Sequence, residues 1–379
     1  MSYWQSEDLY FDGDQFFDHL IRDIEAARES ITVEMYIFND DLLGRKMAAH
    51  LIAAKIRGVK VQIIVDGVGS YNFYEHLSSL FEKKGVTVKT YNPLPFLHPF
   101  YGKVNFLRKL HLALLRLLRL NKRNHRKIVT VDEHIMYAGS FNFTAEHTSF
   151  ALDGKWKDIG IRVTGPMVRY AVLNFKRNWK LRDYYRYKKH LKRLPRSNWR
   201  HSPLRMNHTL TMKRYFHKNF LNRIHRAQNR IWFVTPYFIP RRRMIRLLGA
   251  AAARGVDVRI LTTWKTDVKI FRTLQFFYFP YLLSKGVKVF QYSDTVLHAK
   301  NYIIDNWMTV GSTNLNHRSL IHDLEVDLVV QEEANQKMIE EHFLQLTGTL
   351  ELVTAESLRT RSFVDRMMGR LYFLFRYWL

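Results

Sequence analysis

Apolar and polar positions in the first 90 residues follow two patterns, one typical of helices and one typical of strands. Apolar residues recur every three or four positions in the helical stretches, and they dominate the short extended stretches between them. The expected order is helix, strand, helix, strand, helix, strand, over residues 14–29, 31–38, 42–57, 59–65, 74–84 and 86–91. Strands that alternate with helices in this way predict an α/β layer.

The same order of elements returns about 200 residues later. The second series is expected over residues 210–228, 231–234, 244–254, 256–261 and 287–292. Gly58 and Gly85, which end two helices, recur as Gly255 and Gly286 at offsets of 197 and 201. The offset falls to 173 at the motifs described next, so the first half contains about 28 additional residues before its motif. The chain is therefore an internal duplication with one insertion.

Each half contains the pattern His-x-Lys-x4-Asp followed by Gly-Ser-x-Asn. The first copy consists of His125, Lys127, Asp132, Ser140 and Asn142. The second copy repeats every one of these residue types, at His298, Lys300, Asp305, Ser312 and Asn314. One such match could arise by chance, but two matches with the same tail indicate a single site built from two similar halves.

The paired motif suits chemistry at a phosphodiester. One histidine can attack phosphorus while the other protonates the leaving oxygen. Lys127 and Lys300 would place positive charge near the non-bridging oxygens, and the serines and asparagines of the two tails would add hydrogen bonds. Because these cations are side chains, and because the chain has no His-Glu-x-x-His motif, carboxylate cluster or cysteine, we expect no metal and no other cofactor.

A catalytic histidine also needs a partner for its second ring nitrogen. Asp158 and Glu325 are the candidates, since each follows a motif and precedes an expected strand, over residues 159–163 and 326–330. Asp132 and Asp305 complete the motifs. If each motif is one continuous strand, they face away from the histidine and the lysine, so we expect a structural role for them. We assign most other histidines to ordinary surface or core positions, including His134, His147, His322 and His342.

Charge and composition limit the classes of molecule that the protein is expected to bind. The chain has 60 Lys plus Arg against 34 Asp plus Glu, a formal net charge of +26, so it should be attracted to polyanions such as nucleic acid or an anionic membrane. It has no cysteine, which excludes disulfides. We expect neither a signal peptide in the first 15 residues nor a membrane span, because no run of about 18 uncharged apolar residues occurs. Any membrane contact would be peripheral.

The insertion, residues 93–123, contains basic residues and no acidic ones. A Leu-rich stripe lies opposite the basic side of its helical wheel, which favours a helix lying in the plane of a membrane. The alternative is a helix packed on the core with a solvated basic face. The tail is also amphipathic and fits either interpretation. We divide the chain into residues 1–190 for the first domain, 191–206 for a linker, 207–350 for the second domain and 351–379 for the tail.

With these motifs the sequence resembles the phospholipase D superfamily, whose hallmark is the paired His-x-Lys-x4-Asp pattern. Within the superfamily it is most similar to bacterial cardiolipin synthases, on the stretches 33–41, 125–129, 139–147, 156–160, 235–238 and 311–316. The resemblance implies an α/β protein of two phospholipase D-like domains. Each domain would be a mixed sheet flanked by helices, and a pseudo-twofold axis would place the active site at their junction.

The resemblance also implies a reaction. Two phosphatidylglycerol molecules would give cardiolipin and glycerol through a covalent phosphatidyl-histidine, with His125 as nucleophile and His298 as acid and base. The reverse assignment stays open because the halves are alike. The partner would be an anionic membrane containing phosphatidylglycerol and cardiolipin, approached from the cytoplasmic face of the inner cell membrane.

Three alternatives remain: a lipid hydrolase, a nucleic-acid phosphodiesterase of the same superfamily, and a non-catalytic membrane-binding protein. The net charge alone would suit DNA. The two Leu-rich segments favour lipid over nucleic acid, since a nuclease gains nothing from exposed leucines. Both motifs are intact, which disfavours a non-catalytic role. The sequence leaves the oligomeric state open.

Overall fold

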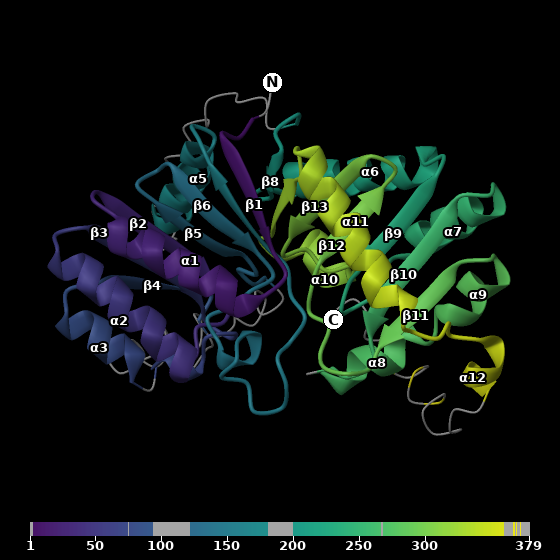
Figure 1. Ribbon diagram of the computed structural model, residues 1–379, viewed down its shortest axis with the longest axis horizontal. Helices are drawn as coiled ribbons and strands as arrows, with labels where there is room; N and C mark the ends of the chain where they lie inside the picture. The colour runs from purple at the N-terminus through teal and green to yellow at the C-terminus, as the bar shows by residue number, and fades with distance from the viewer. Residues whose placement is uncertain are drawn as a thin grey trace, which may run out of the picture.

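Two seven-stranded mixed sheets, one from each half of the chain, form the framework of the protein in the computed structural model (Figure 1). The structure describes residues 3–74, 76–93, 122–180, 200–266 and 268–359, together with Met367, Gly369 and Tyr372. Both sheets have helices on their faces. The expected two-domain α/β fold is therefore confirmed.

The two sheets have the same strand order. The first runs β1 (Ser6–Tyr10), β7 (Gly160–Thr164), β6 (Ile135–Gly139), β5 (Lys127–Val131), β2 (Ser30–Met35), β3 (Lys60–Asp66), β4 (Thr87–Tyr91). The second runs β8 (Leu204–Met206), β14 (Val326–Val329), β13 (Trp307–Gly311), β12 (Asn301–Ile304), β9 (Arg230–Val234), β10 (Asp257–Thr263), β11 (Lys288–Tyr292). In each sheet the last three strands named are parallel to one another and the other pairings are antiparallel. This one-to-one match is the structural form of the duplication.

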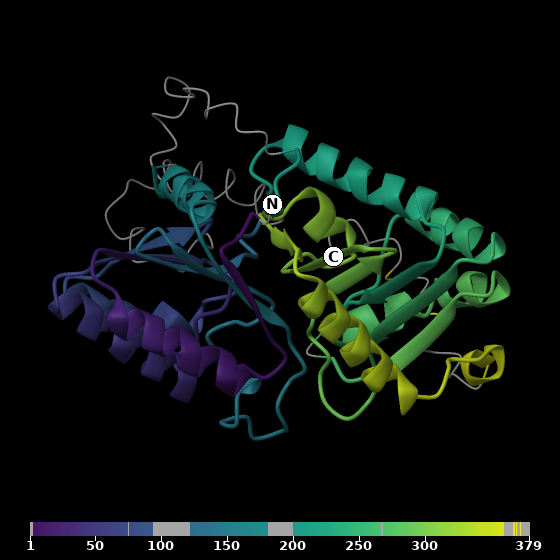
Figure 2. The same ribbon diagram turned by 45° about the horizontal axis from the view of Figure 1, so that its top comes forward.

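Helices cover both faces of each sheet (Figure 2). Those of the first half are α1 (Gly13–Ala26), α2 (Leu42–Ile56), α3 (Leu77–Lys83) and α5 (Val168–Lys180), with short 3-10 turns η1 (Asn72–Tyr74) and η3 (Ala145–His147). Those of the second half are α6 (Leu210–Arg226), α7 (Arg242–Ala253), α8 (Lys269–Gln275), α9 (Phe279–Ser284), α10 (His317–Ile321), α11 (Glu333–Gly348) and α12 (Ala355–Arg359). The parallel strands and the helices between them follow the expected order closely.

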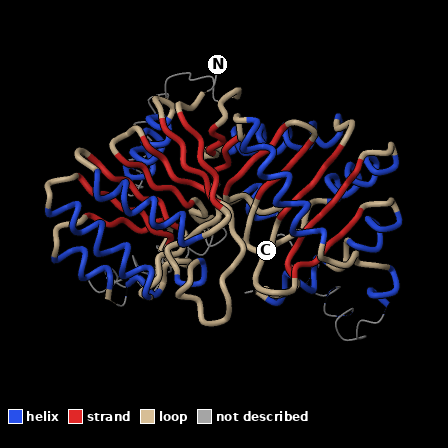
Figure 3. The backbone as a smooth tube through the Cα atoms, in the orientation of Figure 1, coloured by secondary structure: helices blue, strands red, loops and turns tan. Residues whose placement is uncertain are grey.

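Three apolar cores hold these layers together. One lies between the first sheet and α1, α2 and α3, and another lies between the second sheet and α6, α7 and α9. The third is shared by the two halves, because it joins side chains from both sheets with α5 and α11. Figure 3 shows the strands of the two sheets converging at this shared core. A common core of this kind fixes the two halves in one relative position, which a site built from both requires.

Glycines end the helices where the chain turns back toward the sheet. Gly58 and Gly255 have φ of +96° and +91°, and each lies two positions before the first residue of a parallel strand. Only glycine adopts this left-handed conformation without a steric cost from Cβ. The two glycines that marked the repeat in the sequence therefore mark the same turn in each domain.

Leu204–Met206, which we placed in the linker, is the edge strand β8 of the second sheet. Most of the insertion expected over residues 93–123, namely residues 94–121, lies outside the described residues, as do residues 181–199 of the connector and most of the tail after Arg359. Arg123, at the end of the insertion, is 1% exposed, so it is not part of a solvated basic face. None of the helices in the described part of the chain combines the length and apolar character needed to cross a bilayer.

Candidate active site

The two motif histidines lie just before equivalent strands in the middle of the molecule. His125 precedes β5 and His298 precedes β12, and both are nearly buried, with 7% and 5% of their surface exposed. Each strand is the first antiparallel neighbour of the parallel half of its sheet. Neither motif is one continuous strand, because β5 begins only at Lys127 and ends before Asp132.

Each histidine is held by a carboxylate from the other half of the chain. Nδ1 of His125 lies 3.1 Å from both Oε1 and Oε2 of Glu325. Nδ1 of His298 lies 2.7 Å from Oδ1 of Asp158. Both carboxylates are buried. The pairing is thus crossed, so neither half contains a complete histidine–carboxylate pair.

Backbone hydrogen bonds fix the crossed pairs. The N–H of His125 donates to the carbonyl of Leu324 at 3.0 Å, directly before Glu325. In the same way the N–H of His298 donates to the carbonyl of Lys157 at 2.7 Å, directly before Asp158. Main-chain contacts at both points therefore set the approach of each imidazole to its carboxylate, and the domain interface positions the chemistry.

The two lysines are buried beside the histidines. Nζ of Lys127 donates to the carbonyl of His125 at 2.8 Å, and Nζ of Lys300 donates to the carbonyl of His298. Lys127 also lies 4.8 Å from the centre of the Tyr36 ring, which stands edge-on to His125. Each lysine is therefore fixed at the backbone of its own histidine.

Burial shifts the titration of the site. Desolvation, together with the charge of Lys127, holds the pKa of His125 well below its usual range. Desolvation and Lys300 lower the pKa of His298 to about 3, although Asp158 acts in the opposite direction. Desolvation also lowers the pKa of Lys127 strongly. In this surrounding the imidazole of His125 is neutral, which is the form that can act as a nucleophile.

The two carboxylates differ in their titration. Burial raises the pKa of Glu325 to about 7, against the effects of Lys127 and of two serine hydroxyls. Burial also opposes ionisation of Asp158, but electrostatic interactions and hydrogen bonds with His147 and His298 hold its pKa well below the usual range. The halves are therefore alike in geometry and unlike in electrostatics.

The Gly-Ser-x-Asn tails support the carboxylates. Ser312 donates to Oε2 of Glu325 and accepts from the N–H of Val326. Among the described residues, Ser140 bonds to the backbone of Ile159 and not to a carboxylate. Asn142 accepts from the N–H of Ile37 at 3.3 Å. Oδ1 of Asn314 is buried and has no hydrogen-bond partner in the described part of the chain. Three of the four tail residues, Ser140, Ser312 and Asn142, therefore hydrogen-bond to the backbone of the scaffold, and Ser312 also contacts a carboxylate.

The motif aspartates are at a distance from the histidines, beyond the far ends of the strands. Asp132 accepts hydrogen bonds from the N–H groups of residues 28–30 at 2.8–2.9 Å, and its backbone is in the left-handed region with φ of +49°. Asp305 makes the same three bonds to residues 228–230 and has φ of +50°. Both side chains cap the loop that leads into β2 or β9.

Our assignment of His147 to an ordinary position is incomplete, because its Nδ1 lies 2.7 Å from Oδ2 of Asp158. His147, Asp158 and His298 are close enough together to hold a metal ion. However, both imidazoles already present Nδ1 to the carboxylate at hydrogen-bonding distance.

The sequence did contain a signal for the position of His147. His147 and Ser319 occupy the same place in the repeat, at the offset of 172 that relates Asn142 to Asn314.

Arg126, the middle residue of the first motif, also joins the two halves, and sequence analysis missed it. Its guanidinium is fully buried and donates to the carbonyls of Glu325 and Asn207 and to the carboxylate of Glu34. The corresponding residue of the second motif is Ala299. One half of the duplication therefore supplies a buried cation that the other lacks.

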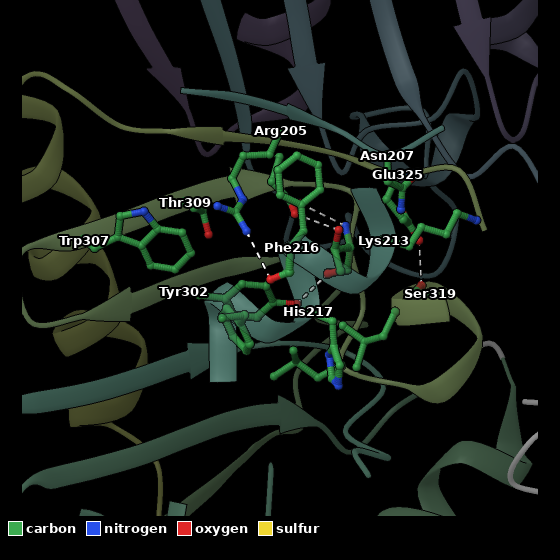
Figure 4. Close-up of a pocket in the computed structure, with 15 residues that line it drawn as sticks. Arg205, Asn207, Lys213, Phe216, His217, Tyr302, Trp307, Thr309, Ser319 and Glu325 are labelled. Carbon is green, nitrogen blue, oxygen red and sulfur yellow. Dashed lines mark hydrogen bonds between the residues drawn. The ribbon is translucent and has the colours of Figure 1, made fainter. Parts of the chain in front are cut away.

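A narrow cavity of about 50 Å³ adjoins Glu325 inside the second domain (Figure 4). Its lining includes Ser319, which donates to Oε1 of Glu325 at 2.6 Å, and it extends past Tyr302 to Trp307. Neither motif histidine lines it. This cavity is therefore a feature of the surroundings of Glu325, and the motif histidines are not part of it.

Comparisons with known proteins identify the family to which this chain is similar. The profile of the family described as "Cardiolipin synthase, PLD-like domain" matches residues 20–157 and 220–347, together more than half of the chain. A cardiolipin synthase of Clostridium perfringens is 28% identical over 95% of this chain and 74% of its own length. Cardiolipin synthase A of Pectobacterium carotovorum is 29% identical over 94% of this chain and 72% of its own length.

Solved structures show the same fold. A phosphatidylserine synthase of Haemophilus influenzae superposes with a TM-score of 0.71, over 98% of this chain and 95% of that one, at 13% identity. A polyphosphate kinase of Porphyromonas gingivalis superposes with a TM-score of 0.59, over 89% of this chain and 50% of that one, at 13% identity. At these identities the comparison supports the architecture and nothing finer.

Proposed function

The chain belongs to the cardiolipin synthase, PLD-like domain family and is a phosphatidyltransferase-type enzyme of the phospholipase D superfamily. From this premise we propose that it makes cardiolipin from two phosphatidylglycerol molecules and releases glycerol. The observation that supports the proposal best is the crossed pairing, in which His125 and His298 face one junction and each is oriented by a carboxylate of the other domain.

The first step transfers the phosphatidyl group to the enzyme. Nε2 of His125 attacks the phosphorus of one phosphatidylglycerol while its Nδ1–H remains hydrogen-bonded to Glu325. The phosphorus–oxygen bond to the headgroup breaks, and the leaving glycerol oxygen takes a proton from Nε2 of His298. The phosphodiester brings a negative charge that counters the effect of burial on His298, so the imidazolium needed for this transfer becomes accessible.

The second step regenerates the enzyme. The neutral His298 removes a proton from the headgroup hydroxyl of a second phosphatidylglycerol, and that oxygen attacks phosphorus as the bond to His125 breaks. The products are cardiolipin and the free imidazole of His125. Lys127 and Lys300, held at the backbone of the two histidines, stabilise the negative charge on the phosphoryl oxygens in both steps. No cofactor enters this scheme.

The test is direct. Purified protein is incubated with vesicles of labelled phosphatidylglycerol, and the lipids are separated by chromatography. We expect cardiolipin and free glycerol in equal amounts. Phosphatidic acid as the main product would instead identify a lipid hydrolase, and cleavage of DNA without action on lipid would identify a nuclease.

Trapping the intermediate tests the assignment of the two histidines. With His298→Ala and a donor whose headgroup leaves without protonation, we expect labelled phosphatidyl-enzyme to accumulate. With His125→Ala we expect none. The opposite pattern would exchange the two roles. The fold of both variants is checked by thermal unfolding.

The proposed setting is peripheral, at an anionic membrane on the cytoplasmic face of the inner cell membrane. Support comes from the net charge of +26 and from the Leu-rich basic pattern of residues 93–123. A donor and an acceptor that both reside in a bilayer would then reach the junction from the surface at which the protein is docked.

A further inference from the structure

His147 occupies a buried position behind one of the two histidine–carboxylate pairs. It ends the 3-10 turn η3, its side chain is fully buried, and its Nδ1 lies 2.7 Å from Oδ2 of Asp158. The other oxygen of Asp158 lies 2.7 Å from Nδ1 of His298. One carboxylate therefore bridges two imidazoles, and only one of these rings belongs to the motif.

The duplication shows what stands at this place in the other half. Ser140 and Ser312 anchor β7 and β14 through the same pair of backbone bonds, to Ile159 and Val326. The residues before these anchors, Asp158 and Glu325, are therefore equivalent.

The partner of His147 in the repeat is Ser319, whose Oγ donates to Oε1 of Glu325 at 2.6 Å. The same structural place thus holds an imidazole behind Asp158 and a hydroxyl behind Glu325. The imidazole is a larger and more rigid donor than the hydroxyl, and its ring packs against its surroundings.

The backbone around His147 leaves it little freedom. Gly13, at the start of α1, approaches so closely that a Cβ there would lie 1.8 Å from the carbonyl oxygen of His147. The N–H of Trp156 donates to the carbonyl of Glu146 at 2.9 Å. The indole of Trp156 lies edge-on to His147 at 5.5 Å and contacts His298 at 5.4 Å between ring centres. The ring of His147 is thus a fixed donor.

We propose that His147 is a positioning residue that aims Asp158 at His298, and that it makes the two halves chemically different. This inference rests on the proposed function. A carboxylate that accepts from a single imidazole can rotate about its Cβ–Cγ bond, whereas one held at both oxygens by two fixed rings cannot. The proton donor of the first step, His298, must present Nε2 accurately to the leaving oxygen. Loss of this restraint should therefore slow protonation of the leaving group.

Within the described part of the chain, Asp158 contacts His147 from η3 and His298 from the segment before β12, and Lys300, which also precedes β12, acts on His298. Nε2 of His147 is buried and has no hydrogen-bond partner among the described residues. Its contribution to the site therefore goes through Nδ1 and Asp158, and not through direct contact with a substrate.

The test compares the activity of each variant on two substrates with different leaving groups. A purely structural role of His147 would not change the ratio of these two activities. His147→Ser copies the residue of the other half, and Ser319→Ala is the matched control at the equivalent place. Each variant is assayed on phosphatidylglycerol, whose glycerol needs a proton to leave, and on phosphatidyl-p-nitrophenol, whose phenolate does not.

We expect His147→Ser to lose at least about tenfold more activity on phosphatidylglycerol than on the aryl ester, within the range by which general acids contribute. Ser319→Ala, which acts on the nucleophilic side, should slow both substrates alike. His147→Asn, whose amide can still donate to Asp158, should recover part of the loss. Equal losses on both substrates in a folded His147→Ser protein would overturn the proposal.

A second measurement does not depend on lipid turnover. In protein labelled with 15N at histidine, the Nδ1 proton of His298 is identified by its absence from His298→Ala. We expect this resonance to move upfield in His147→Ser and to stay in place in Ser319→Ala, because only the first change alters Asp158. An unchanged resonance in His147→Ser would refute the positioning role. A wild-type enzyme that uses neither lipid would refute the proposed function alone.

Discussion

Nδ1 of His125 lies 3.1 Å from both carboxylate oxygens of Glu325, a residue that is 200 positions away in the sequence and belongs to the other domain. The reciprocal pair, His298 with Asp158, makes the arrangement mutual. Because each domain supplies the carboxylate for the histidine of the other, we expect activity to require both domains in register. Separate domains would each have a motif and no oriented imidazole.

Glu325→Gln tests the orientation of His125. The amide keeps the size of the side chain but removes the negative charge, so the tautomer and the developing imidazolium lose their support. We expect kcat to fall by about 100-fold or more while the protein remains folded. A conservative control is Glu333→Gln at the start of α11, which should leave kcat unchanged. Near wild-type turnover of the Glu325 variant would contradict the role.

The pH profile should reflect the raised pKa of Glu325, which burial moves to about 7. Below that pH the carboxyl is protonated and supports His125 poorly, so kcat/KM should rise as pH increases through about 7. Lys127, Lys300, Ser312 and Ser319 act on the same carboxylate. The rise should be absent from Glu325→Gln, and a profile that is the same in both proteins would assign the titration to another group.

The free energy of unfolding should also depend on the titration of Glu325, but it should fall as pH rises, whereas kcat/KM should rise. The folded-state pKa of Glu325 is raised above the ordinary value of 4.5, so between about pH 4.5 and 7 the folded protein binds more protons than the unfolded chain. The free energy of unfolding contributed by this residue therefore falls as pH rises through that window. Denaturant unfolding of Glu325→Gln should show the variant gaining stability relative to wild type from pH 4.5 to 7.

Asp132→Asn and Asp305→Asn should affect stability and leave the chemistry intact. Each aspartate accepts three backbone hydrogen bonds in a loop that is remote from its histidine, and these bonds lower its pKa although partial burial acts in the opposite direction. We expect a loss of about 1–3 kcal/mol in the free energy of unfolding at neutral pH. Unchanged stability with lost activity would assign these residues to catalysis.

Arg126→Met should be strongly destabilising, because it leaves the carboxylate of Glu34 buried near the interface without its cation. Breaking a buried pair from one side costs about 3–5 kcal/mol. The double variant with Glu34→Gln should recover much of this loss, which urea unfolding would measure. If the double variant were no better than Arg126→Met, the backbone contacts of Arg126 would be its main contribution.

Vesicle binding tests the membrane proposal, which rests on the sequence pattern of residues 93–123 and not on the described structure. We expect binding to vesicles that contain phosphatidylglycerol, weaker binding to neutral vesicles, and strong weakening by salt. Replacing Leu110, Leu114 and Leu117 with Ser should reduce binding and activity on bilayers while sparing a short-chain soluble lipid. Equal loss on both substrates would place the segment in the core or the pocket.

The sequence by itself determined the class of fold, the duplication and the residue types of the chemistry. Local periodicity and glycine stops depend on neighbours a few positions apart, so the parallel strands and their helices could be placed within a few residues. The motif also repeats as a contiguous pattern, which identified His125 and His298 without knowledge of their surroundings. Strand β1 and the short strand β8 were missed because their hydrogen-bond partners, β7 and β14, are more than 100 residues away along the chain.

Only the tertiary structure decided how the two copies combine. Asp158 and Glu325 were found as candidates, but their exchange between domains depends on backbone contacts at the interface, which periodicity does not contain. His147 and Arg126 were missed for the same reason, since a histidine or an arginine acquires its role from what surrounds it. The asymmetry between an imidazole behind Asp158 and a hydroxyl behind Glu325 is present in the sequence as one substitution within a repeat. Its structural consequence follows from the position of His147, whose Nδ1 lies 2.7 Å from Oδ2 of Asp158, the carboxylate that it shares with His298.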